Sequence, residues 1–110
     1  MRVGDIAAGR AGDKGDILDL TLVASDTVAY EKLLRLLSVE RATAALNRVV
    51  AGPVVRYELP NLLALKFVAP DALPGGVHAS LRAGLHWQKA AIWLLLDLDV
   101  EEPSDESRRP

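Results

Sequence analysis

The order of its hydrophobic patterns constrains this chain more than any single motif does. Apolar and polar residues alternate in the segment 18–23, where three leucines share one face, and again in the segment 54–59. An alternation with period two is typical of half-buried strands. Between these segments, apolar residues recur every three or four positions from residue 26 to residue 50, as in an amphipathic helix. The chain is therefore expected to form an α+β domain.

The helical stretch contains two signals for the start of a helix. Ser25 or Asp26 is placed to cap the first helix, and Ser38 has the character of a second N-cap. Gly52-Pro53 is expected to end the helical stretch, because glycine favours a helix end and proline cannot continue the hydrogen-bond ladder. The sequence thus predicts two short helices, or one helix that bends at Ser38.

The remaining elements are predicted from alternation and from turn residues. In order, they are a strand at 54–59, a turn at Pro60-Asn61, a strand at 62–68, a loop at 69–76, a helix at 77–83 and a last strand at 90–100. The order strand, helix, strand, strand, helix, strand is the split βαβ or ferredoxin-like pattern. It predicts a four-stranded antiparallel sheet with helices on one face.

Two features are expected outside that pattern. Residues 2–8 are predicted to add an N-terminal edge strand, and the segment 9–16 is predicted to form a charged, glycine-rich loop. The domain is expected to span residues 1–100, and the charged, proline-bounded tail 101–110 is expected to be disordered. The second face of the sheet would be open, and the apolar residues predicted to form an interface there are Tyr57, Trp93 and Leu95.

Composition excludes several classes of function. The chain has 110 residues, which suits one domain, and a net charge of −2, which gives no reason to expect nucleic acid or a membrane as partner. No apolar run approaches the roughly 18 residues of a membrane span, and no secretion signal is visible. The absence of cysteine excludes disulfides and thiolate sites. We expect a cytoplasmic protein without a cofactor.

The segment Gly9–Asp16 concentrates three glycines and four charged residues. One interpretation is structural, with ion pairs that fix the loop. A second is an interface in which the charges dock on a larger partner. A third is a ligand site, where backbone N–H groups hold a phosphate or carboxylate. The candidate residues are the same in all three: Gly9, Arg10, Gly12, Asp13, Lys14, Gly15 and Asp16.

The sequence assigns no catalytic residue and no metal. Asp13, Asp16 and Asp19 lack the spacing of a calcium-binding loop. The two histidines lack the spacing of a zinc-binding motif. Candidate contacts on a second side of the site are Asn61, Gly75, Gly76 and His78.

Three motifs together resemble the AtuA-like ferredoxin-fold domain family. They are Gly-Arg-Ala-Gly-Asp-Lys-Gly-Asp at 9–16, Tyr-Glu-Leu-Pro-Asn-Leu at 57–62 and Gly-Gly-Val at 75–77. The resemblance covers about residues 2–100. It implies a domain that is the C-terminal part of acyclic terpene utilisation proteins, or a small companion protein, and a context in the catabolism of branched acids as coenzyme A thioesters.

The chain departs from the family pattern at four positions. The resemblance leads us to expect serine at Ala11, asparagine at Asp19, glycine at Leu63 and asparagine at Lys66. These departures change the hydrogen-bonding groups near the candidate site.

Two functions follow from these observations. The first is a non-catalytic small subunit or interaction domain that acts with a larger acyclic-terpene-utilisation-type protein or as a homo-oligomer. The alternative is a ligand-binding protein, or an enzyme with lyase or hydratase chemistry, whose site includes the Gly9–Asp16 loop and takes an acyl-CoA-type molecule.

Overall fold

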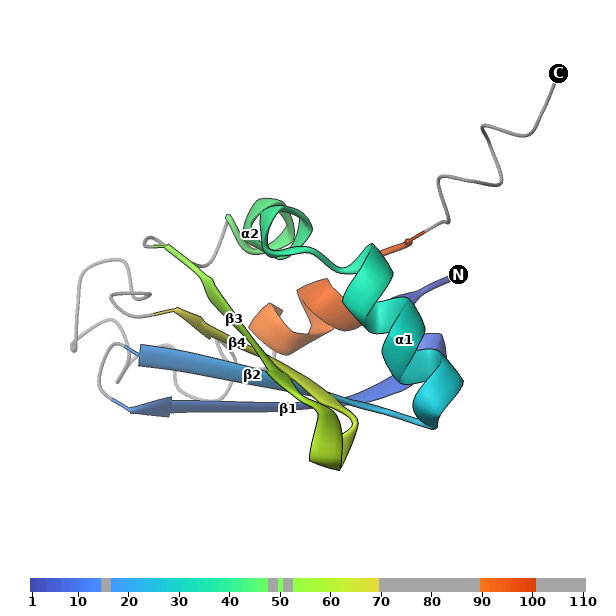
Figure 1. Cartoon of the computed structure of the whole chain (residues 1–110). Coiled ribbons are helices and arrows are strands. Elements are labelled where there is room, and N and C mark those ends of the chain that lie inside the picture. The colour runs from blue at the N-terminus through green and yellow to red at the C-terminus, as the bar shows by residue number, and fades with distance from the viewer. Residues whose placement is uncertain (15–16, 48–49, 51–52, 70–89, 101–110) are drawn as a thin grey trace, which may run out of the picture.

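A four-stranded antiparallel sheet is the centre of the described structure, and the described helices pack against it (Figure 1). The computed structural model describes residues 1–14, 17–47, 50, 53–69 and 90–100. The strands are β1 (Ala7–Lys14), β2 (Ile17–Ala24), β3 (Val55–Leu59) and β4 (Ala64–Ala69). They lie in the order β1-β2-β4-β3, so β1 and β3 are the two edges.

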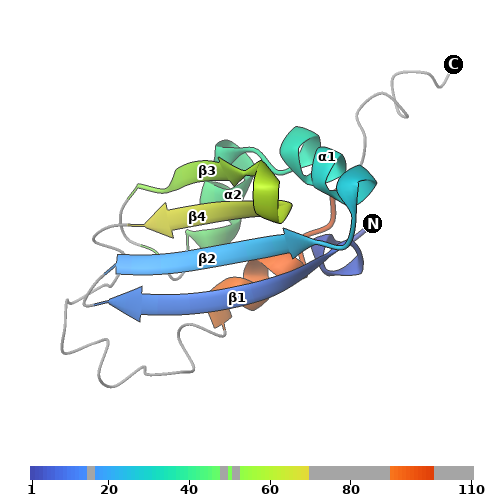
Figure 2. The same ribbon diagram turned by 60° about the horizontal axis from the view of Figure 1, so that its bottom comes forward.

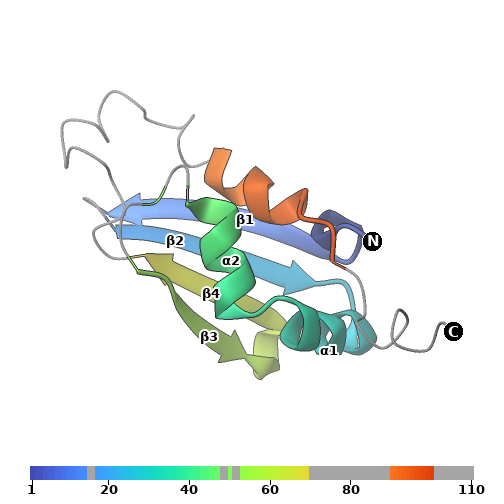
Figure 3. The same ribbon diagram turned by 90° about the horizontal axis from the view of Figure 1, so that it is seen from above.

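Three α-helices of the described part of the chain cover one face of this sheet. They are α1 (Thr27–Leu36), α2 (Val39–Leu46) and the helix 90–96. Short 3-10 helices precede β1 (Val3–Asp5) and join β3 to β4 (Pro60–Leu62). Seen from above, the helix 90–96 lies over β1 and β2, and α2 lies beside it over the middle of the sheet (Figure 3). From the other side the strands lie in front and the helices lie behind them (Figure 2).

The alternation in β2 determines which face is covered. Leu18, Leu20 and Leu22 are buried, and their partners on β4 are Ala69, Phe67 and Leu65. These rows form the floor of a core that α1 closes with Tyr30, Leu33 and Leu36. The predicted α+β class, with four antiparallel strands and helices on one face, is confirmed.

The helix starts are also confirmed. The Asp26 carboxylate accepts a hydrogen bond from the Ala29 N–H at 2.8 Å, and Ser38 Oγ accepts one from the Arg41 N–H at 3.1 Å. Each bond satisfies a donor that the first turn of a helix leaves free. Leu37 and Ser38 separate α1 from α2, so the stretch forms two short helices.

The prediction of a last strand at 90–100 is wrong. Residues 90–96 are helical. The strand pairing described in the rest of this segment is a single isolated β-bridge between Asp99 and Arg2. The run of apolar residues fits both periods, because residues 91, 92, 95 and 96 also share one face of a helix. Alanine and leucine, which dominate the run, are strong helix formers. The helical arrangement buries this stripe in the core.

The fourth strand of the sheet comes instead from the N-terminal region. The prediction of an edge strand at 2–8 and a loop at 9–16 is wrong in its boundaries, since β1 runs from Ala7 to Lys14. Every residue of β1 pairs with β2, from Ala7 opposite Ala24 to Lys14 opposite Ile17. The glycine-rich segment is therefore mostly a strand in a hairpin, and its Gly15-Asp16 turn lies outside the described residues. The predicted helix at 77–83 and the tail 101–110 also lie outside them.

Leu63 follows the 3-10 helix in a left-handed conformation, with φ of 52°. Its carbonyl accepts a hydrogen bond from the Ala24 N–H at 2.8 Å, which holds this turn against the end of β2. A residue with a side chain adopts this conformation at a cost, whereas glycine does so freely. Glycine, which the resemblance led us to expect at position 63, would adopt this conformation without that cost.

The helical assignment of 90–96 separates two residues that a strand would place on one face. Leu95 is fully buried, whereas Trp93 is 56% exposed. We expect Leu95→Ala to lower the free energy of unfolding by about 2–5 kcal/mol, because it opens a cavity in the core. Trp93→Ala should change it by about 1 kcal/mol or less. Urea unfolding of both variants in dilute solution checks this, and equal losses would contradict the helix.

Candidate functional site

The uncovered face of the sheet is the candidate site, and we call it the open face. It is defined by alternate residues that the strand register places together: Ala8, Arg10 and Gly12 on β1, Ile17, Asp19, Thr21 and Val23 on β2, Ala64, Lys66 and Val68 on β4, and Val55, Tyr57 and Leu59 on β3. The three described α-helices lie on the other side of the sheet (Figure 2). Ala64, which follows the 3-10 helix Pro60–Leu62, is nevertheless buried.

Apolar side chains are exposed on this face. Tyr57 is 50% exposed and Val55 40% exposed, and Ile17 and Val23 are exposed to a similar degree. These four account for half of the large exposed hydrophobic residues in the described part of the chain. A concentration of this kind on one flat surface is typical of an interaction site.

A charged pair lies at the centre of the open face. Lys66 Nζ lies 2.8 Å from Asp19 Oδ2, and Thr21 Oγ1 donates a hydrogen bond to Asp19 Oδ1 at 3.3 Å. Thr21 is the direct partner of Lys66 across the strands, so Asp19 pairs with Lys66 along a diagonal. Both ionic side chains are about one-third exposed, which limits the contribution of the pair to stability to roughly 1 kcal/mol.

A shallow depression adjoins this pair on the β3 side. It has a volume of about 370 Å³ and is lined by Tyr57, Leu59, Lys66 and Val68. Its walls are apolar, with the lysine as their polar member. The depression can accept an apolar side chain from another surface, with the Lys66 ammonium free to donate a hydrogen bond at its edge.

The two described glycines of the motif have different surroundings. A Cβ atom on Gly9 would lie 2.6 Å from Ile92 Cγ1 and 3.0 Å from Leu96 Cδ1, so Gly9 allows the helix 90–96 to pack directly on β1. A Cβ atom on Gly12 would meet no atom of the described residues within 4 Å, since Gly12 lies on the open face. Gly9 is therefore a packing residue.

The other predicted residues are dispersed over the molecule. Arg10 is exposed on β1 and makes no hydrogen bond or ion pair within the described residues. Asn61 is exposed in the 3-10 helix beyond Leu59, at the end of the sheet opposite to the Lys14–Ile17 end. It is thus not brought together with the charged end of the hairpin. The side chains of Asp13 and Lys14, and the residues Gly15, Asp16, Gly75, Gly76 and His78, lie outside the described set.

The prediction that Tyr57, Trp93 and Leu95 share the open face is wrong for two of the three residues. Tyr57 lies on the open face, but Leu95 is buried between the helix 90–96 and the sheet. Trp93 is exposed on that helix, on the opposite side of the sheet from Tyr57. Val23 and Ile17 occupy the open face instead. The alternation of β2 contained this signal, because both residues lie out of phase with its buried leucines.

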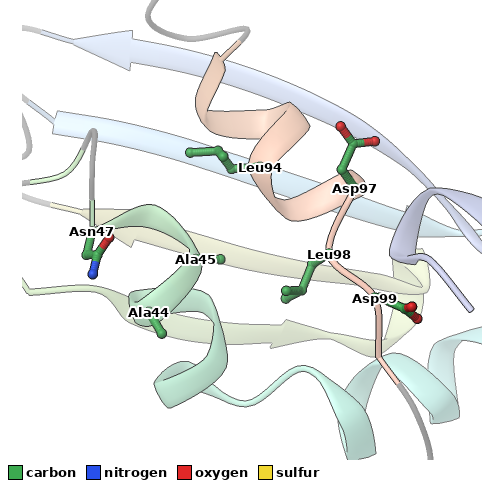
Figure 4. Close-up of a pocket in the computed structure, with 7 residues that line it drawn as sticks. All are labelled: Ala44, Ala45, Asn47, Leu94, Asp97, Leu98 and Asp99. Carbon is green, nitrogen blue, oxygen red and sulfur yellow. The ribbon is translucent and has the colours of Figure 1, made fainter.

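The helix-covered side has a separate groove between α2 and the helix 90–96 (Figure 4). Its volume is about 390 Å³, and the residues that line it are Ala44, Ala45, Asn47, Leu94, Asp97, Leu98 and Asp99. None of these residues was predicted as a site residue. No group of three or more metal-ligating side chains is found among the described residues. Likewise, none of the described helices has the length and apolar character needed to cross a membrane.

Comparison with known families decides the relationship of this chain. The model of the AtuA ferredoxin-like domain matches residues 1–101. The chain belongs to this family. Neither a curated protein nor a solved structure matched it.

The ion pair on the open face joins two residues that the sequence analysis singled out. Asp19 and Lys66 are two of the positions at which asparagine was expected, and they form one ion pair. The charges at these two positions therefore complement each other across adjacent strands. Ala11, where serine was expected, lies on the helix-covered side of β1 and packs partly against the core.

The two glycines provide a matched test of this geometry. We expect Gly9→Ala to lower the free energy of unfolding by about 1–3 kcal/mol, because the new methyl group forces Ile92 and the helix to shift. Gly12→Ala should leave stability unchanged or raise it by up to about 1 kcal/mol, since alanine restricts the unfolded chain more than glycine does. Chemical unfolding of both variants measures the difference, and a larger loss at Gly12 would contradict the assignment of faces.

Proposed function

We propose that this chain is a non-catalytic interaction domain, located in the cytoplasm, that docks through its open face on a larger acyclic-terpene-utilisation-type protein in the catabolism of branched acids or their acyl-CoA esters. Membership of the AtuA ferredoxin-like domain family supports this context. The observation that carries the proposal is the exposed apolar surface of β2 and β3 around the Lys66–Asp19 pair.

The open face has the composition of the centre of a protein interface. Such centres are apolar, are enriched in aromatic residues and contain few unpaired charges. Tyr57 lies beside Lys66, and the lysine charge is already balanced by Asp19. Burial of Tyr57 and Val55 would stabilise a complex by about 25 cal/mol for each Å² of apolar area.

These features define the chemistry of the partner surface. It should present an apolar side chain for the depression at Tyr57 and a hydrogen-bond acceptor for the Lys66 ammonium, which has donors beyond the one directed at Asp19. A flat surface suits docking better than enclosure of a small substrate, which typically requires a pocket that buries most of the molecule.

The proposal predicts that affinity depends on the open face. Tyr57→Ala should weaken binding to the purified larger protein about tenfold or more, because aromatic residues at interface centres dominate binding energy. Val55→Asp should weaken it further, since a buried unpaired carboxylate is costly. Isothermal titration calorimetry with the full chain measures both effects.

Val28→Asp is the matched control. Val28 is 61% exposed on α1, on the opposite side of the sheet, and the variant should bind as the wild type does. Wild-type affinity in both open-face variants would contradict the proposal.

A further inference from the structure

The outer edge of β1 is a second surface, distinct from the open face. β1 is eight residues long, and no described strand lies beyond it. The edge of a sheet presents main-chain N–H and C=O groups that pair with another strand unless the edge is protected. An edge of this length is a template for a strand from another chain.

The hydrogen-bond phase of the hairpin identifies the groups at this edge. The Ser25 N–H donates to the Ile6 carbonyl at 2.9 Å, in register with the β1–β2 ladder. Hydrogen-bonded pairs alternate along an antiparallel ladder, so the even-numbered residues of β1 bond to β2. The main-chain groups of Ala7, Gly9, Ala11 and Asp13 therefore point outward.

The opposite edge of the sheet is protected and provides a contrast. β3 has five residues and lies between Pro53 and Pro60. Its Arg56 guanidinium bonds to Glu58 at 3.0 Å and to the Leu34 carbonyl at 2.9 Å, so charged side chains line this edge. β1 contains no proline, and five of its residues are alanine or glycine, with the sequence AAGRAGDK.

We infer that β1 pairs in antiparallel fashion with β1 of a second copy of this chain, centred on Ala11. The two sheets then form one continuous sheet with all helices on one side. This inference goes beyond the proposed function, because it concerns a different surface and a different partner.

Repulsion between like charges favours this register over the two neighbouring ones. Antiparallel pairing about a twofold axis places even-numbered residues opposite even-numbered ones, so that each face stays continuous. Centring on Ala11 places Arg10 opposite Gly12 of the second copy. A shift by one step places Arg10 opposite its own symmetry mate or opposite Lys14, and like charges directly opposite each other are destabilising.

Gly12 leaves open the space that the Arg10 side chain of the second copy needs in this register. Among the described residues, no atom lies within 4 Å of the place that a Cβ on Gly12 would take, and Asp19 lies directly across from Gly12 on β2. The long side chain of Arg10 from the second copy extends over Gly12 to the Asp19 carboxylate. That carboxylate has acceptor sites left beyond its bonds to Lys66 and Thr21. Arg10 makes no bond to any described residue of its own chain.

Trp93 extends the same surface on the helix side. Leu94 lines the groove shared with α2, and Ile92 and Leu96 lie over Gly9. With 3.6 residues per turn, Trp93 lies on the flank of the helix that faces away from α2. This is the flank toward the outer edge of β1 (Figure 3). Its exposed ring would be buried across the seam between two copies.

Sedimentation equilibrium of the full chain tests the inference. The wild type should form a dimer. Ala11→Pro should raise the dissociation constant about tenfold or more, because it removes two symmetry-related hydrogen bonds across the seam. The Ala11 N–H is not used in the β1–β2 ladder, and proline is tolerated at such edge positions.

Gly12→Gln is a second variant that does not depend on proline. Its side chain fits the open space in a single copy but blocks the path of Arg10, so this variant should also raise the dissociation constant. Circular dichroism should be unchanged in both variants.

Val55→Asp, on the same face at the opposite edge, is the control and should dimerise as the wild type does. It should lose only the larger partner, so a failure of the docking proposal and a failure of this inference give different results. A wild-type chain that stays monomeric up to about 0.5 mM would overturn the inference. A dimer that both β1 variants leave intact would overturn it as well.

Discussion

The packing of the helix 90–96 on the backbone of β1 is the contact on which the rest of the structure depends. It is favoured by a residue without a side chain at position 9, because a Cβ atom there would lie 2.6 Å from Ile92 Cγ1 and 3.0 Å from Leu96 Cδ1. This contact buries the apolar stripe of the helix, with Ala91 and Leu95 at its centre. It also fixes β1 as a covered strand of the sheet, so that a segment with the composition of a loop is held in a ladder.

The same contact gives β1 its two distinct faces. Residues with odd numbers face the helix, and residues with even numbers face the open side, so one strand contributes both to the core and to an exposed surface. Gly9 and Gly12 therefore have opposite roles, although each is a glycine in one motif. The first brings a helix close to the sheet, and the second keeps an exposed surface clear above Asp19.

The open face combines apolar exposure with a balanced charge. Lys66 and Asp19 neutralise each other at its centre, and Tyr57 and Val55 extend to one edge. A second copy at the β1 edge and a larger protein over β3 and β4 would occupy different parts of this face. The two proposed contacts are thus compatible in space, because the sheet separates β1 from β3 by two strands.

The sequence by itself determined the local structure wherever a pattern had one physical meaning. The alternation of Leu18, Leu20 and Leu22 defined β2, and the side chains of Asp26 and Ser38 defined the helix starts, since these signals act within a few residues. Three motifs determined the family. Only the tertiary structure decided the role of the run 90–96, which fits a strand or a helix until a neighbour is present to bury one face. It also decided that Gly9 is a packing residue, and that Asp19 and Lys66, far apart in the chain, form a pair. Contacts of this kind depend on which segments meet in space, and no local pattern specifies that.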